Sequence, residues 1–340
     1  MNYNIFKSLD TNYIAKLFTQ KKDKFFPQFK NEKINHIIMK KTSPDWAKDT
    51  CLVEYKINFS HRQSAKIRGT ASAKRSKINA WQVMNYVYNY HLNQGLSNIA
   101  RPIFLDRQNN ILFYEEVPGI LLADLMNRNE AKKLNKLLPS ISKWLAKLHQ
   151  LRIKPADKIK KSFYPKAEGY QLLFSQIKHF FPELDNEIKK INNLNLIDQI
   201  WNSKKTLIHG DFYPGNIIIN NNNFFVIDFD KSGIGYPLMD LATLYASFEF
   251  PADIWKTKIG LKDQKHYQKI LIENYSHFAE IDLERVKNEL KIILAKIFLD
   301  LTRYFFLFDR LNIDSMKLKD KKILINKLKS LINKAENYLN

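Results

Sequence analysis

Cysteine is almost absent from this sequence, which has only Cys51 among its 340 residues. A single thiol excludes an internal disulfide framework, and the eight scattered histidines add no ligand spacing of the zinc-binding type. We therefore expect a protein of a reducing compartment, the cytoplasm.

Long apolar runs are missing as well. Residues 1–25 contain no run that resembles a signal peptide, and the most apolar later run, residues 292–308, is interrupted by Lys296, Asp300 and Arg303. The apolar residues of that run recur at helical spacing, which predicts a packed C-terminal helix. We expect no segment that inserts into a membrane.

Acidic residues are in deficit, because 55 Lys and Arg face 34 Asp and Glu and give a net charge of +21. So basic a chain suggests nucleic acid or an acidic membrane surface as a partner. The basic residues are spread along the chain, however, and only residues 71–77 form a dense cluster. Since Lys, Asn and Ile are abundant and Gly is scarce, compositional bias also accounts for the charge. With no nucleic-acid-binding motif in the sequence, we expect no specific nucleic-acid partner.

What is present is typical of a large globular protein. Hydrophobic residues make up 45% of the chain and aromatic residues 13%, enough to bury a large core. The length suits two lobes or domains.

Periodicity predicts strands first and helices later. Residues 51–59 alternate strictly between apolar and polar side chains, which predicts a half-buried strand, and residues 64–69 follow as its hairpin partner. Helical spacing predicts a helix over about 76–92, and residues 111–117 predict another strand, which Pro118 and Gly119 stop. From about residue 120 the chain is mostly helical. The predicted class is α+β, with a small sheet-rich N-terminal part and a larger helical C-terminal part.

The most informative stretch is LIHGDFYPGNIIINNNNFFVIDFD, residues 207–230. Its Asn-rich centre separates two apolar strands, as a hairpin turn would. An antiparallel pair brings Asn216, before the first strand, and Asp228, at the end of the second, to the same side, where Asp211 can join them. A carboxylate and an amide oxygen suit Mg²⁺, which completes its octahedron with water and substrate phosphates. Asp211 would be placed to accept a proton from an attacking hydroxyl.

These residues resemble a known family. HGDFYPGN, then IDFD, then GYPLMDLA from residue 235 are similar to the motifs of the aminoglycoside phosphotransferase and choline kinase family of small-molecule kinases. The order of elements matches over roughly residues 45–250. The resemblance implies a bilobal protein-kinase-like fold, with a nucleotide-binding lobe over 1–117 and a helical lobe over 118–340 that carries the catalytic loop and the acceptor site.

The resemblance also implies roles for single residues. Asp211 is similar to the catalytic Asp that orients and deprotonates the acceptor hydroxyl, and Asn216 and Asp228 to the Mg²⁺ ligands. His209 is expected to pack behind the loop, and Asp240 to cap backbone N–H groups at a helix start. Asp230 is either a partner of the metal ligands or a solvated charge.

In the N-terminal lobe, the resemblance places Lys66 where the family has the Lys that holds the α- and β-phosphates of ATP. Lys56, Arg68 and Lys74 are nearby alternatives, and the basic cluster before the helix could also touch phosphates. Two departures from the family stand out. No Gly-rich loop precedes Lys66, and the helix over 76–92 has no acidic residue to pair with it, which makes Glu115 and Glu54 the candidate partners.

The strand over 111–117 ends where the family has its hinge. The resemblance implies that backbone groups of Glu115, Glu116 and Val117 bind the adenine, with Val117 or Leu112 packing on its ring.

Together these expectations describe an ATP- and Mg²⁺-dependent kinase that transfers the γ-phosphate to a hydroxyl of a small molecule. A catalytically silent, kinase-like nucleotide-binding module is the alternative, and a basic nucleic-acid-binding protein is a further one. Residues 150–205 hold more Lys and Arg than Asp and Glu, which favours a neutral or anionic alcohol as acceptor. Aromatic residues there, such as Phe163, Tyr164, Tyr170 and Phe174, could instead line a pocket for a cation.

Overall fold

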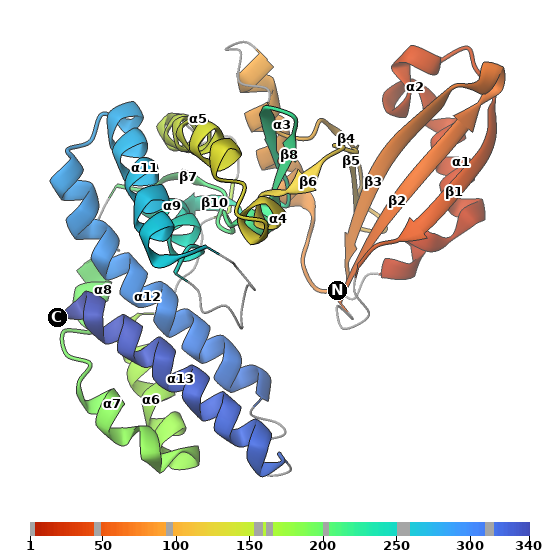
Figure 1. Ribbon diagram of the computed structural model, residues 1–340. Coiled ribbons are helices and arrows are strands. Elements are labelled where there is room, and N and C mark those ends of the chain that lie inside the picture. The colour runs from red at the N-terminus through yellow and green to blue at the C-terminus, as the bar shows by residue number, and fades with distance from the viewer. Residues whose placement is uncertain are drawn as a thin grey trace. The chain divides into compact units, whose positions relative to one another are not determined.

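The computed structural model describes residues 4–43, 49–92, 98–152, 159–160, 166–199, 204–249, 259–309 and 316–340. The chain forms two compact units (Figure 1). The first unit consists of Met1–Leu122, Lys154–Lys160 and Gly215–Gly233, and the remaining segments form the second. The predicted lobe boundary between residues 117 and 118 stays a prediction.

The first unit is built on a five-stranded antiparallel sheet in the order β1-β2-β3-β5-β4. Its strands are β1 (Ile34–Lys41), β2 (Thr50–Phe59), β3 (Ser64–Ser72), β4 (Pro102–Asp106) and β5 (Ile111–Glu115). The helices α1 (Thr11–Gln20) and α2 (Lys22–Phe25) precede the sheet, and α3 (Ile78–Leu92) follows β3. The three predicted strands, of which the last ends at Glu115 rather than at residue 117, and the predicted helix up to residue 92 are thus confirmed.

The two faces of this sheet differ, as the alternation in the sequence predicts. The apolar residues of β2, from Val53 to Phe59, are buried on one face. Helices α1 and α2, which the periodicity analysis did not predict, lie on this side and pack Phe18, Phe25 and Phe26 against it (Figure 1). Burying each Phe side chain stabilises the fold by about 1.5–3 kcal/mol. The opposite face carries polar side chains such as Arg68 and Thr70 together with apolar ones such as Leu52.

A second, three-stranded sheet in the first unit has the order β6-β8-β9. Its strands are β6 (Ile120–Leu121), β8 (Ile217–Asn220) and β9 (Asn223–Val226). The predicted hairpin is confirmed, since Asn220 pairs with Asn223 and Asn221 adopts φ 55° in the turn. At its open end the Ile227 N–H donates to the Asn216 carbonyl at 3.0 Å. The hairpin ends therefore meet, as the sequence predicts.

The second unit is mainly helical. Its elements are α4 (Leu122–Asn127), α5 (Ala131–Gln150), α6 (Ala167–Phe180), α7 (Asp185–Lys189), α8 (Leu196–Gln199), β7 (Thr206–Ile208), β10 (Gly233–Gly235), α9 (Leu238–Ala246), α11 (Leu261–Ala279), α12 (Leu283–Asp309) and α13 (Leu318–Leu339). The predicted C-terminal helix is α12, in which Leu294 and Ile297 are buried but Tyr304 is exposed. None of the described helices is both long and apolar enough to cross a bilayer.

Gly119 joins the end of β5 to β6. Its φ of +151° lies in a region that side-chain-bearing residues rarely adopt, and a Cβ atom there would lie 2.3 Å from the backbone oxygen of Ile219. Because Ile120 pairs with Ile219, this close approach lets β6 join the hairpin.

We predict that Gly119→Ala lowers the free energy of unfolding by at least about 2 kcal/mol, since both backbone strain and a backbone clash result. Gly260→Ala is the matched control, because Gly260 has no atom within 4 Å of the added Cβ. Thermal unfolding of both variants checks this. Equal midpoints for the two would contradict the expected constraint at Gly119.

Candidate active site

A cavity of about 400 Å³ lies in the first unit and includes the polar face of the five-stranded sheet in its wall. Apolar side chains from three strands contribute to it, namely Leu52, Leu112, Tyr114 and Leu121. Its polar lining includes Ser43, Arg68, Thr70, Asn216, Asp228 and Asp230. The cavity thus combines an apolar wall with several hydrogen-bonding and charged groups, which is typical of a small-molecule site.

Asn216 and Asp228 are brought together in this cavity at the open end of the β8–β9 hairpin. Asn216 ends a short 3-10 turn, Pro214–Asn216, and is 5% exposed. Asp228 adopts φ 61°, a left-handed conformation that is uncommon for Asp and occurs often at functional sites. The carboxylate of Asp228 accepts a hydrogen bond from the Asp230 N–H at 3.3 Å.

Two polar atoms of the cavity lining are buried and have no hydrogen-bond partner among the described residues. They are the hydroxyl of Ser43 and the Nε of Arg68. A buried polar group without a partner costs about 1–3 kcal/mol, so such groups call for an explanation. Oxygen atoms of an anionic ligand would satisfy both of them.

Asp230 is not a solvated charge. Its carboxylate forms an ion pair with Lys77, whose side chain is only 1% exposed. The Lys77 ammonium also donates to the Thr70 hydroxyl at 3.0 Å. The sequence placed Lys77 in the basic cluster before α3, but nothing in a Lys-rich segment marks which member is buried.

Burial raises the pKa of the Tyr114 hydroxyl, and the nearby Asp228 and Asp230 carboxylates raise it further, while Arg68 opposes them. Three ionisable side chains thus act on one phenol in the cavity wall. Within the described residues, no three His, Cys, Asp or Glu side chains are grouped to hold a metal ion.

Lys66 is not among the residues that line this cavity. Its side chain is 54% exposed, and its ammonium lies 3.5 Å from Glu116. The partner is therefore Glu116, not Glu115 or Glu54 as the sequence suggested. Arg68, two residues further along β3, does line the cavity, and its guanidinium lies 3.5 Å from Glu116 and 3.9 Å from Glu54.

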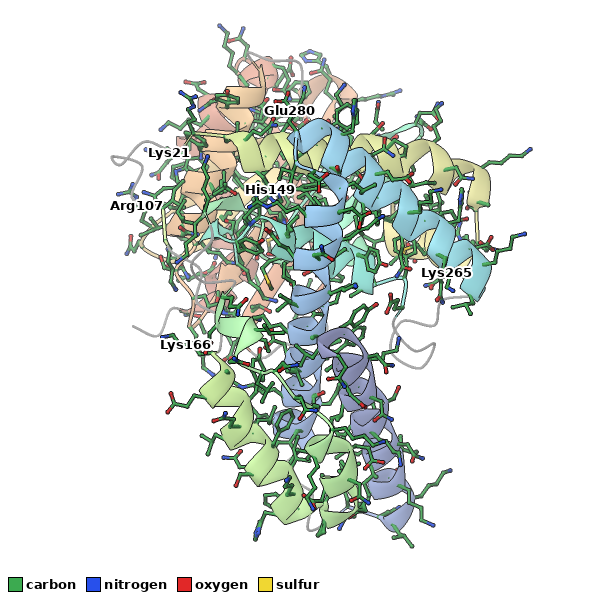
Figure 2. The ribbon with its side chains drawn as sticks, turned by 90° about the vertical axis from the view of Figure 1, so that its left-hand side faces the viewer. Lys21, Arg107, His149, Lys166, Lys265 and Glu280 are labelled. Atoms are coloured by element: carbon green, nitrogen blue, oxygen red, sulfur yellow. The ribbon has the colours of Figure 1, made fainter. Side chains whose placement is uncertain are left out.

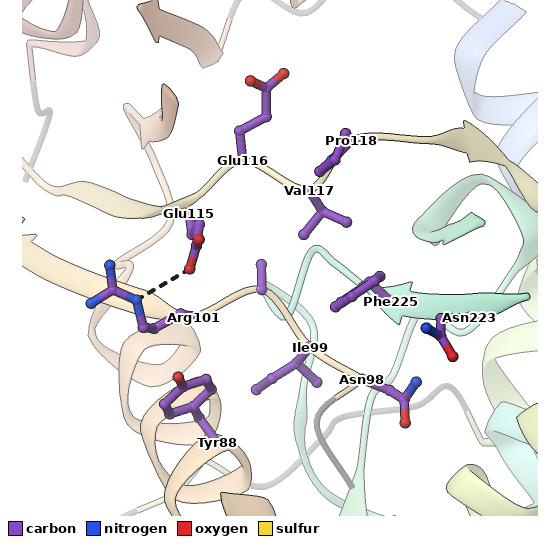
Figure 3. A pocket seen from close by; sticks show the side chains of 11 residues that line it. Tyr88, Asn98, Ile99, Arg101, Glu115, Glu116, Val117, Pro118, Asn223 and Phe225 are labelled. Carbon is purple, nitrogen blue, oxygen red and sulfur yellow. Dashed lines mark hydrogen bonds and ion pairs between the residues drawn. The ribbon is translucent and has the colours of Figure 1, made fainter. Parts of the chain in front are cut away.

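The predicted adenine-binding residues Glu115, Glu116 and Val117 line a different cavity of the first unit, about 440 Å³ in volume (Figure 3). Glu115 pairs there with Arg101 at 3.2 Å, and the Glu116 side chain points away from that pair. The Glu115 N–H donates to the Arg101 carbonyl and the Glu116 N–H to the Lys66 carbonyl. An adenine would therefore have to use other backbone groups of this segment.

Asp211 belongs to the second unit, in a loop whose backbone is held by Asp240. The buried Asp240 carboxylate accepts from the N–H groups of His209 at 2.7 Å and Gly210 at 2.8 Å. The sequence led us to expect that Asp240 caps backbone N–H groups at the start of its helix. The structure corrects this, since the carboxylate oxygens accept from N–H groups of the loop instead. The turn also needs Gly210, which adopts φ 78°.

Behind Asp240, a buried network extends to α5 and α11. His149, at the end of α5 (Figure 2), lies 3.2 Å from the Asp240 carboxylate through Nε2 and 2.8 Å from the Tyr275 hydroxyl through Nδ1. Burial and, next, the Asp240 charge raise the pKa of Tyr275. Side chains of α5 and α11 thus hold the Asp240 carboxylate, which in turn holds the backbone of the Asp211 loop.

His209 and Phe212 anchor the loop on either side of Asp211. His209 is fully buried, and its Nδ1 accepts from the Asp211 N–H at 3.3 Å, which agrees with the predicted supporting role. The Phe212 ring stacks on Trp144 of α5 at 5.7 Å. The backbone of Asp211 is therefore held at both ends.

Comparison with known proteins agrees with this architecture. A sequence model described as the phosphotransferase enzyme family matches residues 79–270, more than half of the chain. No curated protein matches the chain in sequence.

Solved structures show the same fold. A choline kinase from Cryptosporidium parvum Iowa II aligns with a TM-score of 0.60 at 14% identity, over 96% of both chains. An ethanolamine kinase from Plasmodium vivax aligns at 0.55 and 15%, over 95% of this chain and 88% of that one. An ADP-bound aminoglycoside phosphotransferase aligns at 0.54 and 17%, over 97% and 99%. The predicted protein-kinase-like α+β fold is thus confirmed.

We predict that Asp240→Asn destabilises the loop by about 1–3 kcal/mol, because the amide presents a donor where the carboxylate accepted from a backbone N–H. Hydrogen exchange at the His209 and Gly210 amides should become faster, and thermal unfolding should begin earlier. Asp263→Asn in the first turn of α11 serves as control, with an effect within about 0.5 kcal/mol. Unchanged exchange at both amides would show that Asp240 does not hold the loop.

Proposed function

Because the chain belongs to the phosphotransferase enzyme family, we propose that it transfers the γ-phosphate of ATP to a hydroxyl group of a small molecule. The observation that carries this proposal is the cavity in which Asn216 and Asp228 meet two buried donor atoms, the Ser43 hydroxyl and the Arg68 Nε, that have no hydrogen-bond partner among the described residues. An amide and a carboxylate suit a divalent cation, and the unpaired donors suit phosphate oxygens.

Asn216 and Asp228 are the proposed ligands of Mg²⁺, which would offset the negative charge of the phosphates and orient them. Asp228 has no ion-pair partner among the described residues, so its charge is available to a cation. Asp211 is proposed to orient the acceptor hydroxyl and take its proton. The rigid support of the Asp211 backbone favours this role, since positioning decides the efficiency of phosphoryl transfer.

The other proposed nucleotide contacts are residues that do not line the cavity of Asn216 and Asp228. Lys66 remains a proposed phosphate contact, because it shares the polar face of β3 with Arg68 and Thr70. Backbone groups of Glu115 to Val117 remain the proposed adenine contacts. ATP as donor is supported by the ADP bound to one of the structurally similar phosphotransferases.

A neutral or anionic alcohol is the proposed acceptor. Tyr170, Phe174 and Phe181 are buried in the second unit, which favours a core role for them over a cage for a cation. Phe163 and Tyr164 lie outside the described residues. A screen for ADP release with neutral, anionic and cationic alcohols tests both the activity and the acceptor class, and a silent nucleotide-binding module would release none with any of them.

We predict that Asp228→Asn abolishes Mg²⁺-dependent ATP binding while the protein stays folded, because the anionic metal ligand is lost. Calorimetry with a non-hydrolysable ATP analogue and Mg²⁺ checks this. Asp23→Asn, on the exposed surface of α2, is the control and should bind as the parent does. Parental affinity in Asp228→Asn would remove Asp228 from the metal site.

We predict that Asp211→Asn leaves binding of the ATP analogue nearly unchanged and lowers the rate of phosphoryl transfer by about 10²-fold or more. The amide keeps the shape of the side chain but cannot take the proton. Single-turnover transfer and analogue binding, measured on the same preparation, separate the two effects. Equal loss of binding in Asp211→Asn and Asp228→Asn would mean that the two roles are assigned wrongly.

A further inference from the structure

Lys77 is a buried cation that does not line the cavity of the candidate active site itself but contacts two residues that do. Fully buried lysines are rare because an ammonium loses its hydration, so they occur with a compensating partner. Here the partners are the Asp230 carboxylate and the Thr70 hydroxyl, and both of these residues line the cavity. The charge of Lys77 therefore acts on the cavity through the groups that form its wall.

The backbone around Lys77 is fixed as well. The Lys77 N–H donates to the Asn110 side chain at 2.7 Å. The same Asn110 amide donates to the carbonyls of Ser72 and Arg75 at 2.7 Å each. The connection from β3 to α3 is thus tied at three points, which fixes the backbone from which the Lys77 side chain extends.

Two of the three charged residues that line the cavity, Asp230 and Arg68, are held in ion pairs. Its lining carries two carboxylates, Asp228 and Asp230, and one guanidinium, Arg68, which also lies near Glu54 and Glu116. Lys77 neutralises Asp230. Asp228 is consequently the one lining carboxylate without an ion pair in the described part of the chain.

We propose that Lys77, by neutralising Asp230, makes this cavity select a metal–nucleotide complex over a free divalent cation. One free carboxylate and one amide hold a free cation weakly, because they offer a single negative charge and leave the other ligand positions to water or to phosphate oxygens. Two free carboxylates would attract the cation alone and repel phosphates. Lys77 is thus a positioning residue that acts through Asp230, and this inference rests on the proposed function for the identity of the ligand.

Lys66 cannot take this role. Its ammonium is half exposed and lies beside Glu116, so its removal would leave the Lys77–Asp230 pair intact. The polar residue of β3 that touches the pair is Thr70, which bonds the Lys77 ammonium.

The test is Lys77→Met, with Lys74→Met as the matched control. Lys74 belongs to the same connection and was an alternative phosphate contact in the sequence, but it does not line the cavity, is 69% exposed and pairs with Asp49. Calorimetry measures three ligands, which are Mn²⁺ alone, a non-hydrolysable ATP analogue with Mg²⁺, and adenosine. In Lys77→Met we expect Mn²⁺ to bind about tenfold more tightly and the analogue about tenfold more weakly, with adenosine unchanged. Lys74→Met should match the parent in all three.

The double variant Lys77→Met/Asp230→Asn separates the charge from the fold. It removes the pair together, leaves no buried carboxylate unpaired, and should return Mn²⁺ and the analogue to within about threefold of the parent. This variant also decides the matter if Lys77→Met alone does not fold, since loss of analogue binding in the double variant would overturn a role through Asp230.

Other outcomes are equally decisive. Parental binding of Mn²⁺ and analogue by a folded Lys77→Met would overturn the inference, and so would a joint weakening of all three ligands, which indicates structural support only. If the parent binds no nucleotide, the proposed function fails, while the Mn²⁺ comparison of parent, single and double variants still decides the role of Lys77.

Discussion

The hydrogen bond from the Ile227 N–H to the Asn216 carbonyl is the contact on which the candidate site depends. It joins the two open ends of the β8–β9 hairpin. The Asn216 amide and the Asp228 carboxylate, which two strands separate in the sequence, thereby line the same cavity. The hairpin is itself held by β6, which reaches it only because Gly119 permits a close backbone approach. The positions of the Asn216 and Asp228 side chains thus depend on contacts of the backbone.

Each unit contains a carboxylate that is largely shielded from water and therefore needs a compensating partner. In the first unit the buried Lys77 neutralises Asp230. In the second, Asp240 is satisfied by two backbone N–H groups and by His149. Buried charges are tolerated only with such partners, and removing one partner is costly. The cavity and the Asp211 loop are therefore fixed by local compensation of charge.

The sequence predicted the elements whose signals are local. The alternation from Val53 to Phe59, the Asn-rich hairpin turn and the spacing of Asp211, Asn216 and Asp228 depend on neighbours in the chain, and the fold that they indicated is confirmed. Ion-pair partners depend instead on tertiary packing. In a chain with so many lysines, no local signal distinguishes the buried Lys77 from the exposed Lys66, or selects Glu116 as the partner of Lys66. For the same reason the sequence placed Asp240 correctly at a helix start but did not indicate that it binds the backbone N–H groups of His209 and Gly210.

The first unit is assembled from segments that lie far apart in the sequence, and this has a consequence for its folding during synthesis. Asn98 bonds through its backbone to Val226 and through its side chain to Phe224, so this part of the unit lacks partners until the hairpin has been made. The chain between Leu122 and Gly215 is synthesised first, which takes on the order of ten seconds at ordinary rates of translation. During that interval the emerging polypeptide carries an unfinished sheet domain with its ligand-facing wall incomplete.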